Sequence, residues 1–127
     1  MVAKTFGSAV HGVDARTITV EVNVTSGQHL YISGLPDNAV KESAHRVESA
    51  MKTAFYFMPR NKVVVNLAPA DIRKEGSAYD LPMAISVLQA SGQMEGNDLD
   101  KYVIMGELSL EVRRGLDGVI HPMPIHP

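Results

Sequence analysis

The chain has 127 residues, no cysteine, a formal net charge of -2 and 45% apolar residues. These values are typical of one globular domain, and they exclude disulfides, thiolate nucleophiles and cysteine-ligated zinc. No apolar signal segment follows Lys4, so we expect a cytoplasmic protein with no membrane contact. The small negative charge gives no general attraction to nucleic acid, and DNA binding would need a local basic patch.

The N-terminal part is predicted to form strands. Residues 3–10 and 13–24 resemble two strands joined at His11-Gly12, and the second alternates apolar and polar side chains, as a strand with one wet face does. A turn at Ser26-Gly27 leads into a third predicted strand over residues 28–33. We therefore expect the chain to begin as a β-meander.

One long amphipathic helix is predicted next. Asp37 is placed to cap its first N–H groups, and helical spacing continues through Phe55. Five apolar residues share one face: Val40, Ala44, Val47, Met51 and Ala54. Lys41 and Arg46 belong to the opposite face, which we expect to be solvated. Residues 55–58, Phe-Tyr-Phe-Met, are expected to plug one end of the core.

A buried strand and a charged loop occupy the centre of the chain. Val63 to Val65 are three β-branched residues in a row, which predicts a strand buried on both faces and ending at Leu67 or Ala68. Charges of both signs follow over residues 71–75, and Gly76 supplies the backbone freedom of a sharp turn. We expect any chemistry to lie in this region.

A second helix is predicted after the charged loop. Ser77 or Asp80 is the expected cap, and Pro82 fits the first turn because its missing N–H is not needed there. Gly92 is expected to end the helix with a left-handed backbone. Its apolar face consists of Leu81, Ala84, Ile85 and Leu88.

The last predicted elements complete the fold class. A polar loop over residues 94–100 precedes a short strand at Tyr102 to Met105, and the chain continues extended to Leu110. Two runs of strands with helices between them predict an α+β domain in which helices pack on one side of a mixed sheet.

Three segments carry a family resemblance. They are GLPDNAVKES (34–43), VVVNLAPADIRKEGSAYDLPMA (63–84) and GELSL (106–110). They resemble the N-terminal domain of the bacterial magnesium-chelatase-like AAA+ ATPases, the competence-related ComM/YifB group. The resemblance implies a ribosomal protein S5 domain 2-like fold, related to the Lon protease proteolytic domain, over residues 1–110. It also implies a role in DNA uptake and recombination by branch migration, with the ATPase domain, DNA and the other subunits of a hexamer as partners.

No nucleotide or metal site is expected in this chain. A G-x-x-x-x-G-K-[ST] motif is absent, so ATP and Mg²⁺ are expected only in the ATPase domain of the family, and the chain is expected to be one part of a longer protein. The five histidines show no metal-ligand spacing.

The likeness to Lon gives an alternative function, a degenerate Ser–Lys peptidase. In that pattern the serine follows an acidic-Gly pair at a helix start, where free N–H groups stabilise an oxyanion. Here Glu75-Gly76 places Ala78 at the position of the nucleophile and Ser77 one residue early, which on a helix is a rotation of about 100°. No lysine follows Lys101 to serve as the base. We therefore expect a non-catalytic module, with a peptidase using Ser77 as the alternative.

Four basic residues are the candidates for a DNA or partner contact. Arg73 and Lys74 follow the central strand, and they would form a patch if the loop brought them to Arg46 or Lys41. The alternative is that Asp71, Glu75 and Asp80 pair with these bases inside the domain.

Residues 111–127 depart from the family pattern. Residues 111–115, EVRRG, intervene after the GELSL segment, and three prolines occur among the last six residues. Because proline interrupts helices and sheet ladders, we expect this tail to be irregular.

Overall fold

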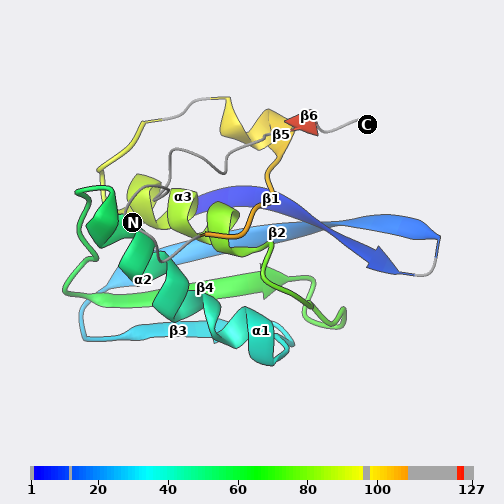
Figure 1. Cartoon of the computed structure of the whole chain (residues 1–127), viewed down its shortest axis with the longest axis horizontal. Coiled ribbons are helices and arrows are strands. Elements are labelled where there is room, and N and C mark those ends of the chain that lie inside the picture. The colour runs from blue at the N-terminus through cyan, green and yellow to red at the C-terminus, as the bar shows by residue number, and fades with distance from the viewer. Residues whose placement is uncertain (1, 12, 96–97, 109–122, 125–127) are drawn as a thin grey trace.

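A six-stranded mixed sheet with helices on one face forms the domain, in a computed structural model that describes residues 2–11, 13–95, 98–108 and 123–124 (Figure 1). Its elements are β1 (Val2–His11), β2 (Asp14–Thr25), β3 (Leu30–Ser33), α1 (Asn38–Lys41), α2 (Ser43–Thr53), β4 (Lys62–Ala68), α3 (Asp80–Ala90), a 3₁₀ turn (Leu99–Lys101), β5 (Tyr102–Val103) and β6 (Met123–Pro124). The predicted α+β class is confirmed. None of the helices in the described ranges is both long and apolar enough to cross a bilayer.

The strand order is β3-β4-β2-β1-β5-β6, so the predicted β-meander is wrong. β1 and β2 form the expected antiparallel hairpin, but β4 lies beside β2 in the place expected for β3. β3 pairs with the other side of β4 and runs parallel to it. A parallel pair needs a crossover connection, and α1 and α2 supply it between β3 and β4.

Among the described residues, one face of the sheet is buried and the other is not. In β4 the side chains of Val63, Val65 and Leu67 are buried, whereas Val64 between them is half-buried. The prediction that this strand is buried on both faces is therefore wrong, although its end at Ala68 is confirmed. Helices cover a single face of the sheet, so alternate residues of each strand turn away from the core.

The predicted long helix is two helices, α1 and α2, that meet at Glu42. The N–H of His45 donates to the carbonyl of Glu42 at 3.0 Å, a bond three residues back that tightens the turn and interrupts the regular ladder. Asp37 caps α1 as predicted, since its carboxylate accepts from the N–H of Val40 at 2.8 Å.

α3 is the central helix of the layer. It packs on β1 and β2, and α2 packs against it and against β3. Every residue of α3 except Gln89 is buried, so the helix is apolar around most of its circumference rather than on the one predicted face. Pro82 lies in its first turn and Gly92, with φ of +77°, follows its end, as predicted.

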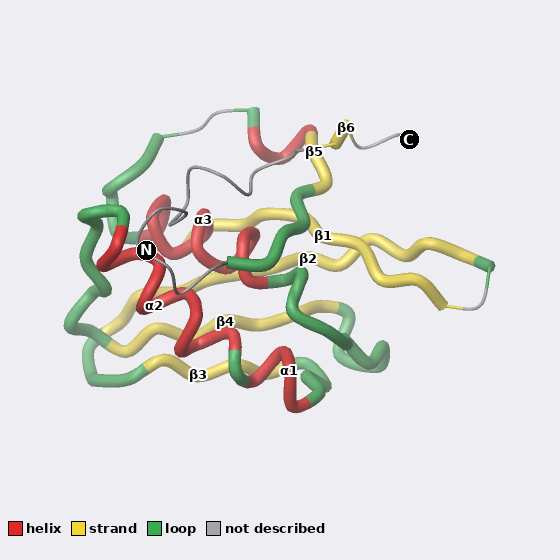
Figure 2. Tube along the Cα trace, in the orientation of Figure 1, coloured by secondary structure: helices red, strands yellow, loops and turns green. Residues whose placement is uncertain are grey.

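Two long loops lie at opposite ends of β4: residues 54–61 between α2 and β4, and residues 69–79 between β4 and α3 (Figure 2). The aromatic part of the first loop is not the predicted plug. Phe55 and Phe57 are 97% and 60% exposed, while Tyr56 and Met58 are half-buried against the core. Along residues 55–58, exposed and half-buried side chains alternate.

The predicted irregular tail falls mainly on residues 109–122 and 125–127, which lie outside the described part of the chain. Met123–Pro124, however, form β6 and pair with β5. The prediction is wrong for these two residues, because a proline on a two-residue strand at the sheet edge leaves no central ladder bond unmade.

Candidate functional site

The loop of residues 69–79 is fixed to the segment before α1. The N–H of Lys74 donates to the carbonyl of Leu35 at 3.0 Å, and the N–H of Asp37 donates to the carbonyl of Lys74 at 3.0 Å. Together they make a one-residue parallel bridge between Pro36 and Lys74. The charged loop is therefore an ordered part of the domain rather than a free surface excursion.

The carboxylate of Asp37 joins the two segments a second time. One of its oxygens caps α1 through Val40, and the other accepts from the N–H of Gly76 at 3.2 Å. Gly76 has φ of +85°, a left-handed conformation that suits glycine, as the sequence predicts. A single side chain thus sets both the start of a helix and the turn of the loop.

Lys74 points into the protein. Its side chain is fully buried and its ammonium donates to the carbonyl of Pro69. Loss of hydration lowers the pKa of Lys74, and the negative charge of Asp71 opposes that shift. Lys74 therefore does not present its charge to a phosphate group outside the domain.

Arg46 is partly buried and is bound by Asp80. Its Nε and Nη2 atoms donate to the two oxygens of the buried Asp80 carboxylate at 2.6 and 3.0 Å, and Nη2 also reaches the carbonyl of Ala39 at 2.7 Å. The hydrogen bond to Asp80 raises the pKa of Arg46 above its ordinary value, and burial opposes the shift. The prediction of a solvated face is wrong at Arg46 because its ion partner lies on α3, 34 residues further along the chain.

Asp80 also connects Arg46 to the segment that follows β5. The N–H of Leu108 donates to Asp80 Oδ2 at 3.1 Å, so one buried carboxylate links α2, α3 and the segment after β5. Asp80 is predicted from the sequence to be either a helix cap or an internal partner for the basic residues. The second of these predictions is confirmed.

Neither Ser77 nor Asp80 caps α3 with its side chain. The residue before the helix is Tyr79, which makes no side-chain cap bond. The early N–H groups find backbone partners instead: Asp80 donates to the carbonyl of Ser77 at 3.2 Å and Leu81 to that of Gly106 at 3.0 Å. Because these carbonyls already satisfy the donors, the helix needs no side-chain cap.

Lys74 does not form the Ser–Lys pair that a Lon-type peptidase needs. Its ammonium is bound to Pro69, and Ser77 is half-buried in the turn before α3. In the described part of the chain, Lys74 is the lysine nearest to Ser77 in sequence. Its ammonium stabilises the loop through Pro69 and makes no hydrogen bond to Ser77.

Lys41 and Arg73 are brought together at the surface. Both line a shallow pocket of about 440 Å³, along with Leu35, Pro36, Asp37 and Asn38. The side chain of Arg73 is 70% exposed and lies 3.6 Å from Glu75, a contact that is weak in water. Of the four basic candidates, the structure therefore places Lys41 and Arg73 on one surface, while Arg46 and Lys74 are bound to partners within the domain.

Tyr79 is a site residue that sequence reasoning missed. It is buried, its hydroxyl donates to the carbonyl of Ser8 at 3.1 Å, and burial raises its pKa to about 12. A tyrosine between a loop and a helix carries no pattern that predicts a contact 71 residues back in the chain.

Comparisons with known proteins place the chain among sequence relatives. Residues 20–124 match the family model described as subunit ChlI of Mg-chelatase. The chain is 48% identical over 114 residues to the uncharacterized protein YifB of Escherichia coli, covering 88% of this chain and 22% of that protein. It is 41% identical over 117 residues to competence protein ComM of Haemophilus influenzae, covering 91% of this chain and 23% of that protein.

A more distant relative is the uncharacterized protein Mb2921c of Mycobacterium bovis, 35% identical over 119 residues, with 92% of this chain and 24% of that protein covered. The chain thus spans about a quarter of the length of these relatives. The family model covers most of the chain, including both loops and α3. The chain therefore belongs to the family of subunit ChlI of Mg-chelatase.

Proposed function

We propose that this chain is a non-catalytic module of a magnesium-chelatase-like AAA+ ATPase, serving assembly, partner or DNA contacts in DNA uptake and recombination. The family assignment supports the ATPase setting, and the name of competence protein ComM supports the link to competence. A mixed sheet with helices on one face agrees with an S5 domain 2-like, Lon-related fold. ATP and Mg²⁺ would bind in another part of the longer protein.

The observation that carries the non-catalytic assignment is the use of the buried charged groups. The ammonium of Lys74 and the carboxylate of Asp80 lie in the region where chemistry was expected, and both are bound within the fold. A catalytic acid or base must reach the substrate, whereas these groups stabilise the loop and the helix start. We therefore assign the region to scaffolding.

The non-catalytic assignment is tested with a fluorophosphonate probe and with casein as substrate. We expect no labelling of Ser77 and no casein hydrolysis by the full chain. The Ser77→Ala variant is the matched control, because it lacks the only serine in the proposed position. Labelling that disappears in Ser77→Ala would establish the peptidase alternative and overturn the assignment.

The DNA contact is proposed for Lys41 and Arg73. They are exposed, they share one pocket, and phosphate contacts are made by cations at the surface. Their neighbours Asp37 and Glu75 limit the positive potential, so we expect modest affinity that falls steeply as salt rises.

The test is fluorescence anisotropy with single-stranded, duplex and branched DNA over a range of salt concentrations. Replacing Lys41 and Arg73 together with alanine should weaken binding and reduce the salt slope for duplex by about 2, since each phosphate contact contributes about 0.9. The matched control replaces Lys52 and Lys101, two exposed lysines in i,i+4 and i,i+3 pairs. Equal affinities of the two double variants for DNA would show that Lys41 and Arg73 do not form a DNA-binding surface.

A further inference from the structure

The two edges of the sheet differ in how they are protected. The strand order ends with β3 on one side and with β6 on the other. β6 has two residues, and Pro124 has no N–H to offer to a neighbouring strand. β3 has four residues, Leu30–Ser33, none of them proline or charged, and it pairs with β4 without a bulge. Apart from its shortness, β3 lacks the usual protection of an edge strand, so its outer edge is open to pairing (Figure 1).

The free hydrogen-bonding groups of this edge belong to Leu30 and Ile32. The N–H of Val63 on β4 donates to the carbonyl of His29 at 2.9 Å, and Leu30 is the register partner of Val63. Since alternate residues of a strand direct their N–H and C=O groups to opposite sides, Tyr31 shares the orientation of His29, toward β4. Leu30 and Ile32 direct theirs outward. Two N–H and two C=O groups therefore lie along the outer edge with the spacing of a strand, and no described residue pairs with them.

β3 is held in shape before any partner binds. It pairs with β4 over all four of its residues, and the Oγ of Ser33 donates to Asn66 Oδ1 at 3.0 Å. Gly34, which follows β3, has φ of +101°, and a Cβ at this position would collide with the carbonyl of Leu67 on β4. Glycine therefore allows the chain to leave β3 while it stays close to β4. A fixed strand loses little conformational entropy when a second strand pairs with it.

The side chains on the two faces of β3 indicate what a pairing strand would carry. Leu30 and Ile32 lie on the face of the helix layer, where they are half-buried and packed against the core. Tyr31 lies on the opposite face and is 50% exposed, and the Lys62 ammonium lies 5.3 Å from the centre of its ring. Lys62 is exposed and has no carboxylate partner among the described residues. A strand beside β3 would thus meet apolar surface on one face and an available cation on the other.

We propose that β3 is the docking site of an extended peptide segment from a partner protein, which adds one strand to the sheet. Its backbone pairs with the N–H and C=O groups of Leu30 and Ile32. Its residue beside Tyr31 is acidic and contacts the Lys62 ammonium, and the residues on either side of that acid are apolar, because neighbouring residues of a strand point to opposite faces. Only a peptide strand supplies N–H and C=O groups that alternate at this spacing, so the occupant is a peptide and not a nucleic acid or a lipid. The inference goes beyond the proposed function and does not rest on the DNA contact.

The first test is amide hydrogen exchange, followed by NMR on the full chain without DNA. The probe is the peptide Ser-Thr-Val-Glu-Val-Thr-Ser, whose side chains follow the same order from either end, so it suits both parallel and antiparallel pairing. In the free chain the N–H groups of Leu30 and Ile32 should exchange faster than those of Tyr31 and Ser33, which are directed to β4. With the peptide present, exchange at Leu30 and Ile32 should slow about tenfold, with little change at Tyr31 and Ser33.

A control peptide has proline in place of both valines. It cannot extend the ladder, so it should leave the exchange of Leu30 and Ile32 unchanged. Equal slowing by both peptides, or no slowing by the valine peptide at about 1 mM, would overturn the proposal. Slow exchange at Leu30 that appears without peptide and becomes slower as protein concentration rises would also overturn it, because a second copy would then be the occupant.

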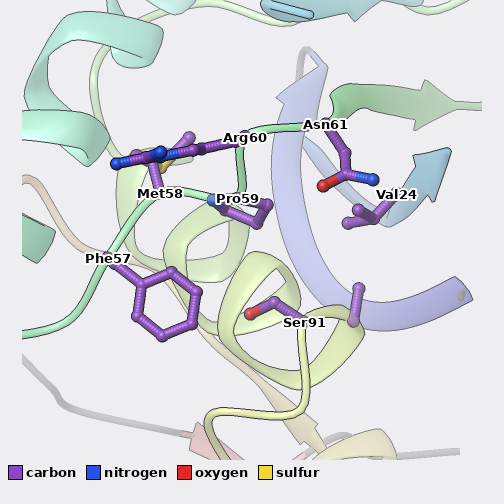
Figure 3. A pocket seen from close by; sticks show the side chains of 8 residues that line it. Val24, Phe57, Met58, Pro59, Arg60, Asn61 and Ser91 are labelled. Atoms are coloured by element: carbon purple, nitrogen blue, oxygen red, sulfur yellow. The ribbon is translucent and has the colours of Figure 1, made fainter. Parts of the chain in front are cut away.

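A charge reversal tests the face on which the acid lies. Lys62→Glu should weaken binding of the fluorescein-labelled valine peptide about tenfold, measured by fluorescence anisotropy, and a peptide with lysine in place of its glutamate should bind the variant more tightly than the parent chain. Arg60→Glu is the matched control, because Arg60 is an exposed cation two residues earlier that lines the groove between the end of α3 and residues 57–61 (Figure 3). Equal effects of the two substitutions would refute the contact with Lys62. Neither test involves DNA, so its outcome is separate from that of the surface formed by Lys41 and Arg73.

Discussion

The two loops at the ends of β4 differ in which side chains they bury and which they expose. The loop of residues 69–79 is rich in charge, yet it buries the Lys74 ammonium and leads into the buried Asp80 carboxylate. The loop of residues 54–61 is rich in aromatic residues, yet it exposes Phe55 and Phe57. Charge lies inside at one end of the strand and aromatic surface lies outside at the other.

The difference separates a structural region from a recognition region. A buried charge is tolerated only when it is hydrogen-bonded, and both charges in the first region have such partners. An exposed aromatic ring contributes no free energy of burial to the folded state. The first loop therefore contributes to stability, and the second is the one available to a partner.

The largest expected effect is the loss of the buried carboxylate. Asp80→Ala removes the partner of the Arg46 guanidinium and of the Leu108 N–H, which should lower the free energy of unfolding by about 3–5 kcal/mol. Urea unfolding followed by circular dichroism measures it. Glu75→Ala is the control, because its exposed contact with Arg73 should contribute less than about 1 kcal/mol. Similar losses in both variants would contradict the structural role of the first region.

A smaller effect is expected from the titration of Tyr79. Its pKa is raised to about 12, so between its unfolded value of 10.0 and about 12 the unfolded chain loses a proton that the folded chain keeps. Below that range the tyrosine is neutral in both states and contributes no pH dependence. Stability should therefore fall as pH rises through this window, by on the order of 2 kcal/mol for this group.

Tyr79→Phe isolates that contribution, because every other titrating group is retained. At neutral pH the variant should lose about 1 kcal/mol with the hydrogen bond to Ser8. As pH rises above about 10, the wild-type chain should lose stability faster than the variant, measured by urea unfolding at a series of pH values. Parallel pH profiles would show that the hydroxyl is not buried in solution.

The smallest expected effect is a gain in stability, from a substitution in the loop of residues 54–61. Phe55 has φ of +66° and its ring is almost fully exposed, so Phe55→Gly removes a strained backbone and no packing. We expect a gain of about 1 kcal/mol in the free energy of unfolding, read from thermal and urea unfolding. Phe57→Ser, at a residue outside the left-handed region, is the control with little change. Destabilisation by Phe55→Gly would mean that the ring packs in solution.

Local features of the fold could be predicted from sequence, and distant pairings could not. Asp37 as a cap, and Gly76 and Gly92 as left-handed residues, follow from positions within a few residues of each other. The order of β3 and β4 depends on a crossover, which periodicity does not report.

The same limit applies to the candidate site. Arg46 and Lys41 have the same appearance on a helical wheel, because both are basic residues between apolar positions. Lys41 lies at the surface, whereas Arg46 is bound to Asp80. This difference arises because Asp80, on another helix, supplies a buried partner to Arg46 and not to Lys41. Nothing in the local pattern of either residue contains that information.

The position of β4 between β2 and β3 has a consequence for folding during synthesis. The β1–β2 hairpin can pair as soon as it emerges from the ribosome, but one edge of β2 stays open until residues 62–68 have also emerged. An unpaired apolar edge is a template for aggregation. Nascent chains that stall before β4 has emerged from the ribosome should therefore depend on chaperones, whereas chains that stall after Ala68 has emerged should depend on them less.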